Sequence, residues 1–281
     1  MNTMTHRSTC PRCERSTEDR TFARSRRVIF AVLLVGSLLV ACARVEATSL
    51  VALVDRSNNR LIIAADCRVN RDSGSVSKCK IIVEPDCVAA IAGLYEEEAT
   101  GFRLRELVHT ACQEAGNLRS KAEAFLRISR KPYEQAVRSI RDGQPGKSAQ
   151  TTANKPTEVV FAGIQNGHIA LFVRGLVADS VGNISVERFE STAPSYGRAG
   201  FFLGLNGHIR AYVKAHPNWA KEDDLKLAHQ FVEMEVEAHP DLASLPISEL
   251  QIDKDGHVHW LDKGACDSRE SDGTTRETIG N

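Results

Sequence analysis

The chain has 281 residues, of which 42% are hydrophobic and 26% are charged. This balance is typical of a globular protein, and the length fits one domain of ordinary size, or two small ones, with additional segments. Lysine plus arginine and aspartate plus glutamate each number 36, so the formal net charge is zero at pH 7. The composition therefore gives no support to a nucleic-acid partner, which a basic surface would indicate.

The N-terminal segment has the pattern of an export signal. Residues 1–27 are polar with several arginines near their end, and residues 28–43 are apolar. A basic stretch followed by a short apolar run is typical of a signal peptide, and the run is shorter than the roughly 18–20 residues of a comfortable membrane span. A short signal anchor is the alternative. We therefore expect an exported protein, periplasmic or extracellular, or one whose only membrane contact is this segment.

Two cleavage sites compete in this segment. The sequence Val45-Glu46-Ala47 fits a signal peptidase and would free Thr48 as a new N-terminus. The stretch LVAC, ending at Cys42, resembles a bacterial lipobox, and cleavage there would leave a lipidated cysteine. The first site is favoured because of the residues that follow Thr48.

Cysteines and histidines predict neither a metal site nor a cofactor. Cys10 and Cys13 have metal-like spacing, but no second pair follows at a useful distance. His229 and His239 are expected to be solvated or capping residues, and a metal site at His257 and His259 is not expected. The other cysteines stand singly in apolar or loop contexts and are expected to be small core residues rather than a disulfide framework: Cys42, Cys67, Cys79, Cys87, Cys112 and Cys266.

The first part of the expected domain is strand-rich. Four short apolar stretches have the length and composition of β-strands: residues 49–54, 60–66, 80–85 and 87–93. The first two flank the turn-rich sequence DRSNNR and therefore predict a hairpin.

The hydrophobic period then changes to that of helices. Four apolar residues between positions 104 and 111 recur at helical spacing, which predicts a helix over about residues 96–116 with one buried face. A second helix is expected over residues 118–143, disturbed at Pro132 and ended by Gly143.

A second run of strands follows a polar loop at residues 143–157. Residues 158–164 and 168–175 are joined through Asn166-Gly167, a strong hairpin signal. The remaining expected elements are a strand at 184–189, a helix at 224–239 capped by Asp223 or Asp224, and a last hairpin of 248–253 with 257–262. Two sheets packed face to face with helices outside would bury the apolar faces of this series.

Five short motifs occur in order along residues 48–262: TSLVAL at 48–53, AADCR at 64–68, KI at 80–81, IAG at 91–93 and DLAS at 241–244. The motifs occur in the order, and at close to the spacing, of the proteasome β-type family of N-terminal-nucleophile (Ntn) threonine peptidases, which the chain therefore resembles. The resemblance implies an α+β fold, a four-layer αββα sandwich, over residues 48–262. It also implies assembly into a ring of identical subunits that cleaves peptide or other amide bonds.

The resemblance implies a role for Thr48 as the nucleophile. A threonine hydroxyl is a poor nucleophile until a base takes its proton, and the α-amine of an N-terminal Thr48 would be that base. Such an amine has a pKa of about 7.7–8.0 and is partly neutral near pH 7. A nearby Lys80 would favour the neutral amine, and Asp66 would hold Lys80 charged and in place.

Three further residues receive roles from the same resemblance. The Gly93 N–H would point at the developing oxyanion from a turn that favours a residue without Cβ. Asp241 and Ser244 would orient the amine and the hydroxyl of the nucleophile.

The sequence departs from the family pattern at several places. Ala47, rather than glycine, precedes the nucleophile, and a shortened segment after Asp66 leaves Lys78 as a rival for the lysine role. Residues 204–207, Gly-Leu-Asn-Gly, stand where the family has Ser-Gly, so Asn206 is the candidate to replace the missing hydroxyl.

Three functions therefore stay open. The leading one is a threonine hydrolase with residues 1–47 as head and signal, 48–262 as the Ntn domain and 263–281 as a polar flexible tail. The second is a non-catalytic proteasome-like subunit or membrane-anchored scaffold in which Thr48 never becomes N-terminal. The third is an amidase acting on a small substrate.

Overall fold

The computed structural model describes residues 48–71, 74–143, 156–191 and 197–267. The head and signal segment, residues 1–47, lies outside the described residues, as do most of the expected polar loop and residues 268–281. Within the described ranges, no helix is long and apolar enough to cross a membrane.

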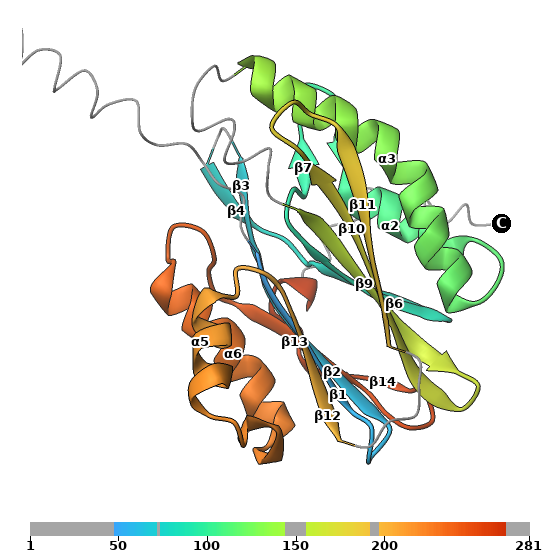
Figure 1. The fold of residues 1–281 in the computed structure, drawn as a ribbon, viewed down its shortest axis with the longest axis vertical. Helices are drawn as coiled ribbons and strands as arrows, with labels where there is room; N and C mark the ends of the chain where they lie inside the picture. Colours follow the sequence, from blue (N-terminus) through green and yellow to red (C-terminus); the bar gives the residue numbers. More distant parts are fainter. Residues whose placement is uncertain (1–47, 72–73, 144–155, 192–196, 268–281) are drawn as a thin grey trace, which may run out of the picture. The chain divides into compact units, whose positions relative to one another are not determined.

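One five-stranded antiparallel sheet contains the expected first and last hairpins. Its strand order is β12-β1-β2-β13-β14 (Figure 1). Its strands are β1 (Ser49–Asp55), β2 (Arg60–Asp66), β12 (Arg198–Gly204), β13 (Ile247–Ile252) and β14 (Val258–Asp262). All seven residues of β1 are buried, because both faces of the sheet are covered. Strand β12 had not been expected from the sequence.

A second five-stranded antiparallel sheet has the order β11-β10-β9-β6-β5. Its strands are β5 (Ile81–Glu84), β6 (Cys87–Ala92), β9 (Thr157–Gln165), β10 (His168–Ala178) and β11 (Ile184–Ser191). The predicted hairpin of β9 and β10 is confirmed. Asn166 and Gly167 both have positive φ, 55° and 77°, as a two-residue turn of this kind requires.

The helices pack on the outer faces of the two sheets. α2 (Leu104–Gln113) and α3 (Leu118–Gly143) cover the second sheet, and α5 (Gly207–Ala215) and α6 (Asp224–Ala238) cover the first. The expected helix cap is confirmed at Asp223, whose carboxylate accepts a hydrogen bond from the Leu225 N–H.

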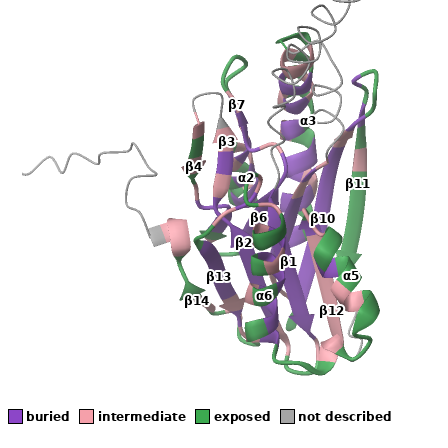
Figure 2. Cartoon of the chain, turned by 90° about the vertical axis from the view of Figure 1, so that its left-hand side faces the viewer, coloured by how far each residue is buried: buried purple, intermediate pink, exposed green. Residues whose placement is uncertain are grey.

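Three groups of buried apolar side chains hold these elements together. One lies between the second sheet and its helices and contains Phe125 and Phe161, with ring centroids 5.7 Å apart. A second lies between the two sheets, and a third lies between the first sheet and α5 and α6, around Phe231. Figure 2 shows the middle strands of the sheets buried.

The first predicted helix is shorter than expected at both ends. Two short strands, β7 (Glu96–Glu97) and β8 (Phe102–Arg103), occupy its expected first turns. The Glu97 carboxylate accepts the N–H groups of Ala99 and Thr100, and Gly101 has φ +70°, so a turn replaces the helix there. The second helix runs through Pro132 without a break, over residues Leu118–Gly143.

The expectation that the cysteines are unpaired core residues is wrong for four of them. Cys79 is bonded to Cys266, and Cys87 on β6 is bonded to Cys112 on α2. The partners are 187 and 25 residues apart in sequence, so only the packing brings them together. Cys67 is a buried free thiol.

Four smaller elements complete the described structure. Strands β3 (Arg68–Arg71) and β4 (Gly74–Ser77) form a hairpin, and η1 (Trp219–Lys221) precedes α6. The segment expected as a flexible tail begins with η2 (Gly264–Asp267), which includes the disulfide-bonded Cys266.

Candidate active site

Three of the predicted site residues meet at the ends of different strands. Thr48 directly precedes β1, Asp66 ends β2, and Lys80 directly precedes β5 of the other sheet. Lys80 Nζ donates a hydrogen bond to Thr48 Oγ1 at 2.8 Å and lies 3.2 Å from both carboxylate oxygens of Asp66. All three are buried: Thr48 is 3% exposed, Asp66 0% and Lys80 1%. A buried ammonium group therefore bridges a hydroxyl and a carboxylate.

The structure distinguishes the two candidate lysines. Lys78 is only half-buried, and its backbone N–H donates to the Cys67 carbonyl at 2.7 Å. Among the described residues, no hydrogen bond joins its side chain to Thr48 or Asp66. Lys80 is therefore the lysine that contacts the candidate nucleophile.

The Asp66 carboxylate is fixed by the backbone as well as by Lys80. The Ser49 N–H donates to Oδ1 at 2.8 Å, and the Arg68 N–H donates to Oδ2 at 3.0 Å. Burial raises the pKa of Asp66, and the Lys80 ammonium group and these N–H donors oppose that effect. The carboxylate thereby orients Lys80 toward Thr48.

The turn after β12 holds the backbone of Thr48. The Leu205 N–H donates to the Thr48 carbonyl at 2.6 Å. Gly204 has φ +67°, and a Cβ at this position would lie 1.9 Å from the Thr48 carbonyl oxygen. Only glycine permits this approach, so the turn at residues 204–207 contacts the backbone of the candidate nucleophile.

Asn206 does not take the place of the missing family hydroxyl at Thr48. Its amide nitrogen donates to the Phe202 carbonyl at 2.9 Å, and its amide oxygen accepts from Arg210 Nε at 2.7 Å. Both ends of the side chain are therefore engaged in anchoring the start of α5.

Gly93 lies in the turn that follows β6 and has φ +98°. A Cβ there would lie 2.4 Å from the Pro156 carbonyl oxygen, so the position requires glycine. The preceding residue, Ala92, has its Cβ 3.4 Å from the place that a Cβ on Gly204 would occupy. The turns of Gly93 and Gly204 are therefore neighbours, and both lie close to Thr48.

Asp241 and Ser244 lie in the connection between α6 and β13. Asp241 is exposed and Ser244 is half-buried, and among the described residues no hydrogen bond joins either side chain to Thr48. Arg68 Nη1 donates to the Pro240 carbonyl at 2.9 Å, which ties this connection to the segment after Asp66. The structure therefore places the pair in the neighbourhood of the site without a contact to the nucleophile.

Glu158 is a residue near the site that the sequence reading missed. It lies on β9, and its carboxylate accepts the Gly204 N–H at 3.1 Å. Burial raises the pKa of Glu158, and the nearby Glu187 adds to the increase, while Arg210 opposes it. A charged residue at the start of an otherwise apolar strand was the available signal.

Glu158 also lines a cavity of about 870 Å³ bordered by β10, β11, β12 and α5. Phe189, Phe201 and Arg210 are among its other lining residues, whereas Thr48 is not. The cavity is thus connected to the candidate site through the Glu158–Gly204 contact rather than opening on the nucleophile itself.

Side chains of metal-ligating type gather elsewhere in the described structure. One group consists of His208, Glu235 and His239, and another of Asp253, Asp255 and His257. Neither group includes Thr48, Lys80 or Asp66. The contacts at Thr48 are made by its hydroxyl, the Lys80 ammonium group and, through that group, the Asp66 carboxylate.

No protein-family model matches this sequence, and no curated protein is found to be similar to it. What the site does is therefore inferred from its residues and their geometry.

Proposed function

We propose that the chain is a threonine-type N-terminal-nucleophile hydrolase that cleaves peptide or other amide bonds after cleavage before Thr48. The observation that carries the proposal is the bridge from Lys80 Nζ to Thr48 Oγ1 and to the Asp66 carboxylate. Because Lys80 donates to the hydroxyl oxygen, the hydroxyl proton remains available to a separate base. The ammonium group also stabilises negative charge that develops on Oγ1.

The base in this proposal is the α-amine that cleavage would create. In the 281-residue chain the Thr48 nitrogen is bound in a peptide bond to Ala47 and is not basic. As a free amine, it would take the Oγ1 proton while Oγ1 attacks the substrate carbonyl carbon. Collapse of the tetrahedral intermediate would break the C–N bond and return this proton to the leaving amine. Water would then hydrolyse the resulting ester and regenerate Thr48.

Gly93, Asp241 and Ser244 have supporting roles in this proposal. The Gly93 N–H is proposed as the donor to the oxyanion, from a turn next to that of Gly204. Asp241 and Ser244 would act only through contacts made after the N-terminus is freed.

The packing order supports a four-layer αββα sandwich as the fold in this proposal. Buried apolar clusters lie between helices and sheet, between sheet and sheet, and again between sheet and helices. This is the layer order that the motif resemblance implies, and it sets strand ends of both sheets beside Thr48.

An exported location belongs to the same proposal. Disulfides form and persist in oxidising compartments, and the described residues contain two. Their presence supports cleavage of an N-terminal signal outside the cytoplasm, with membrane contact only through that segment. Assembly into a homo-oligomeric ring rests on the resemblance alone and would be measured by light scattering of the purified protein.

A non-catalytic subunit or scaffold is the second candidate, and one observation favours it. Thr48 is only 3% exposed and does not line the adjoining cavity. If the chain stays uncut, or is cut before a lipidated Cys42, the site lacks its base. An amidase acting on a small substrate would share the chemistry of the leading proposal and differ only in what reaches Thr48.

The experiment begins with the intact mass and N-terminal sequence of the protein recovered from its native compartment. A start at Thr48 supports the hydrolase, whereas an uncut chain or a start at Cys42 supports the scaffold. The processed protein is then treated with a β-lactone, which should acylate Thr48 and add its mass to the first peptide.

Thr48→Ala should reduce amide hydrolysis by about 10³-fold or more, and Thr48→Ser should retain part of it. Thr110→Ala, which changes an exposed threonine on α2, is the matched control and should leave turnover unchanged. Turnover that survives in a correctly processed Thr48→Ala variant would contradict the assignment of the nucleophile.

A further inference from the structure

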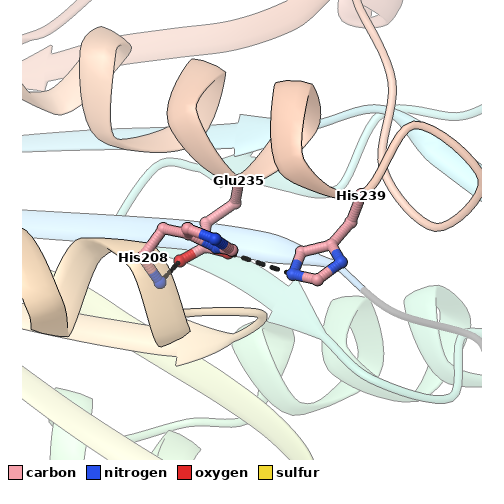
Figure 3. A group of neighbouring side chains, drawn as sticks. All are labelled: His208, Glu235 and His239. Atoms are coloured by element: carbon pink, nitrogen blue, oxygen red, sulfur yellow. Dashed lines mark hydrogen bonds and ion pairs between the residues drawn. The ribbon is translucent and has the colours of Figure 1, made fainter.

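Two imidazoles and one buried carboxylate meet where α5 begins beside the C-terminal end of α6 (Figure 3). Glu235 Oε2 lies 3.3 Å from His208 Nδ1 and 3.7 Å from His239 Nε2. The three ligand-type atoms all lie within 4.8 Å of one another. We propose that His208, Glu235 and His239 form a binding site for a divalent transition-metal ion, with Zn²⁺ as the best match.

The distances between the side chains fit a shared metal ion. Zinc binds imidazole nitrogen and carboxylate oxygen at about 2.0–2.1 Å in tetrahedral geometry, which places neighbouring ligand atoms about 3.4 Å apart. The observed separations of 3.3 Å and 3.7 Å lie close to that value. The longer one exceeds a hydrogen bond, so a direct His239–Glu235 hydrogen bond does not explain why this imidazole lies there.

The two carboxylate oxygens of Glu235 have different partners. Oε1 accepts the backbone N–H groups of His208 at 2.6 Å and Ile209 at 2.9 Å, which fixes the orientation of the group. Oε2 is left facing the two imidazoles. Ligating carboxylates are commonly held by a hydrogen bond of this kind on their other oxygen.

The charge of the site also favours a cation. Glu235 is fully buried, and burying a carboxylate without a positive partner is costly. The polar groups at its side chain are two backbone N–H dipoles and the two imidazoles. A divalent cation would neutralise the carboxylate and use both imidazole nitrogens.

The site has access to solvent on its histidine side. The side chains of His208 and His239 are 52% and 35% exposed, so an ion could enter and a water molecule could complete four ligands. Glu235 lies in the last turn of α6 and His239 is the C-cap residue directly after that helix, whereas His208 comes from α5. The sequence analysis expected His239 to be a solvated or capping residue, and its backbone N–H does cap α6 by donating to the Glu235 carbonyl at 3.0 Å.

The proposed ion would act as a clamp between α5 and α6. His208 follows directly after the turn at residues 204–207, whose Leu205 N–H holds the Thr48 carbonyl. Binding would therefore stabilise the start of α5 and the turn beside Thr48. This inference does not depend on Thr48 being a nucleophile, because it rests on metal binding alone.

The test uses the full-length, metal-free protein without a polyhistidine tag. Isothermal titration with ZnCl₂ should show one saturable site, and Zn²⁺ should raise the thermal unfolding midpoint. Co²⁺ should produce visible absorption bands of a four-coordinate site, and Mg²⁺ should have neither effect, because it prefers oxygen ligands.

His239→Ala and His208→Ala should each weaken Zn²⁺ binding by about 100-fold or more, since each removes one of three ligands. His229→Ala, on the same helix α6, and His257→Ala, in the second group, are the matched controls and should bind as the parent does. Glu235→Gln keeps an oxygen to accept the two N–H groups and should also lose binding.

Two outcomes would overturn the proposal. One is the absence of saturable Zn²⁺ binding by protein whose circular dichroism is that of a folded chain. The other is binding that is unchanged in His208→Ala and His239→Ala, or that is lost in His257→Ala instead. In either case the three side chains form an ion-paired cluster and not a metal site.

Discussion

At the scale of single residues, Lys80 and Asp66 are charged groups that the fold has removed from water. A buried ion pair of this kind contributes little net stability, but loss of one partner leaves the other charge buried and unpaired. The residues are 1% and 0% exposed, so solvent cannot replace a missing partner. The pair is therefore a sensitive point of the structure whether or not it serves catalysis.

Lys80→Ala should destabilise the protein by about 3–5 kcal/mol, because Asp66 would be left without its cation. The free energy of unfolding in urea is the measurement. Lys78→Ala, two residues away and half-buried, is the control and should change it by less than about 0.5 kcal/mol. A small effect of Lys80→Ala would mean that Asp66 is reached by water or is protonated.

Gly204→Ala should destabilise the chain by about 2–4 kcal/mol. The position has φ +67°, and the added Cβ would overlap the Thr48 carbonyl oxygen. Gly207→Ala in the same turn is the matched control, since a Cβ there meets nothing within 4 Å and α5 begins at this residue. Equal unfolding midpoints for the two variants would contradict the close approach of this turn to Thr48.

Only part of the candidate site was accessible from sequence. Thr48, Asp66 and Lys80 stood in recognisable motifs, and the structure brings them into contact. Glu158 and the cluster around Glu235 were missed, because their partners lie 46 and 27 residues away and only packing joins them. Asp241 and Ser244 matched a motif as well as Lys80 did, yet a motif alone does not fix the direction of two loop side chains.

At the scale of elements, the hairpin of β13 and β14 is closed by the side chain of Asp253. Oδ1 accepts the N–H groups of Asp255 and His257, both at 2.9 Å, and Oδ2 lies 3.0 Å from His259 Nε2. The His259 hydrogen bond lowers the pKa of Asp253 to about 2 from its ordinary 3.8. The ionised carboxylate is therefore the form that stabilises the turn.

The pH dependence of this hairpin follows from the lowered pKa. A carboxylate that is more acidic in the folded state adds stability above pH 3.8, and this stability is lost as the pH falls through about 2. Asp253→Asn should therefore lower the thermal unfolding midpoint at pH 5–7 and bring the variant close to the parent near pH 2. Asp255→Asn, in the same turn, is the control; a constant difference from pH 7 to pH 2 would contradict the assignment.

Element boundaries were predictable where the local sequence acts alone. The Asn166-Gly167 hairpin and the Asp223 cap were confirmed, because turn and cap preferences depend on neighbouring backbone groups. The first helix began later than expected, since the Glu97 side chain stabilises a turn that helical periodicity does not reveal. Strand β12 was not predicted because its apolar run, Phe201–Leu203, is only three residues long and lies between two glycines.

At the scale of the whole described domain, covalent links reinforce the packing. The Cys79–Cys266 disulfide joins the residue next to Lys80 to the segment that follows β14. Cys87–Cys112 joins the second sheet to α2. Single-sequence reasoning predicted unpaired core cysteines, because nothing in the local context of a cysteine identifies a partner in another layer.

Cys266→Ser should lower the free energy of unfolding by about 2–5 kcal/mol through loss of the long-range link. Dithiothreitol, which reduces both disulfides, should cause a larger loss in the parent than Cys266→Ser does, and a smaller further loss in the variant, which keeps Cys87–Cys112. Urea unfolding with and without reductant is the measurement. Cys67→Ser, at the buried free thiol, should not change the response to reductant, and a parent insensitive to reductant would contradict the pairing.

The distance between Cys79 and Cys266 along the chain has a consequence for the order in which the protein is made. They are 187 positions apart, and ribosomes add about 5–20 residues per second, so their thiols cannot meet until roughly 10–40 s after Cys79 is synthesised. A nascent chain that has reached the end of α3 already contains Thr48, Asp66 and Lys80. It lacks Leu205, whose N–H donates to the Thr48 carbonyl, and Cys266, which forms the disulfide with Cys79 next to Lys80. Thr48, Asp66 and Lys80 can therefore take the arrangement of the finished structure only in a chain that has been synthesised past its last strand, β14.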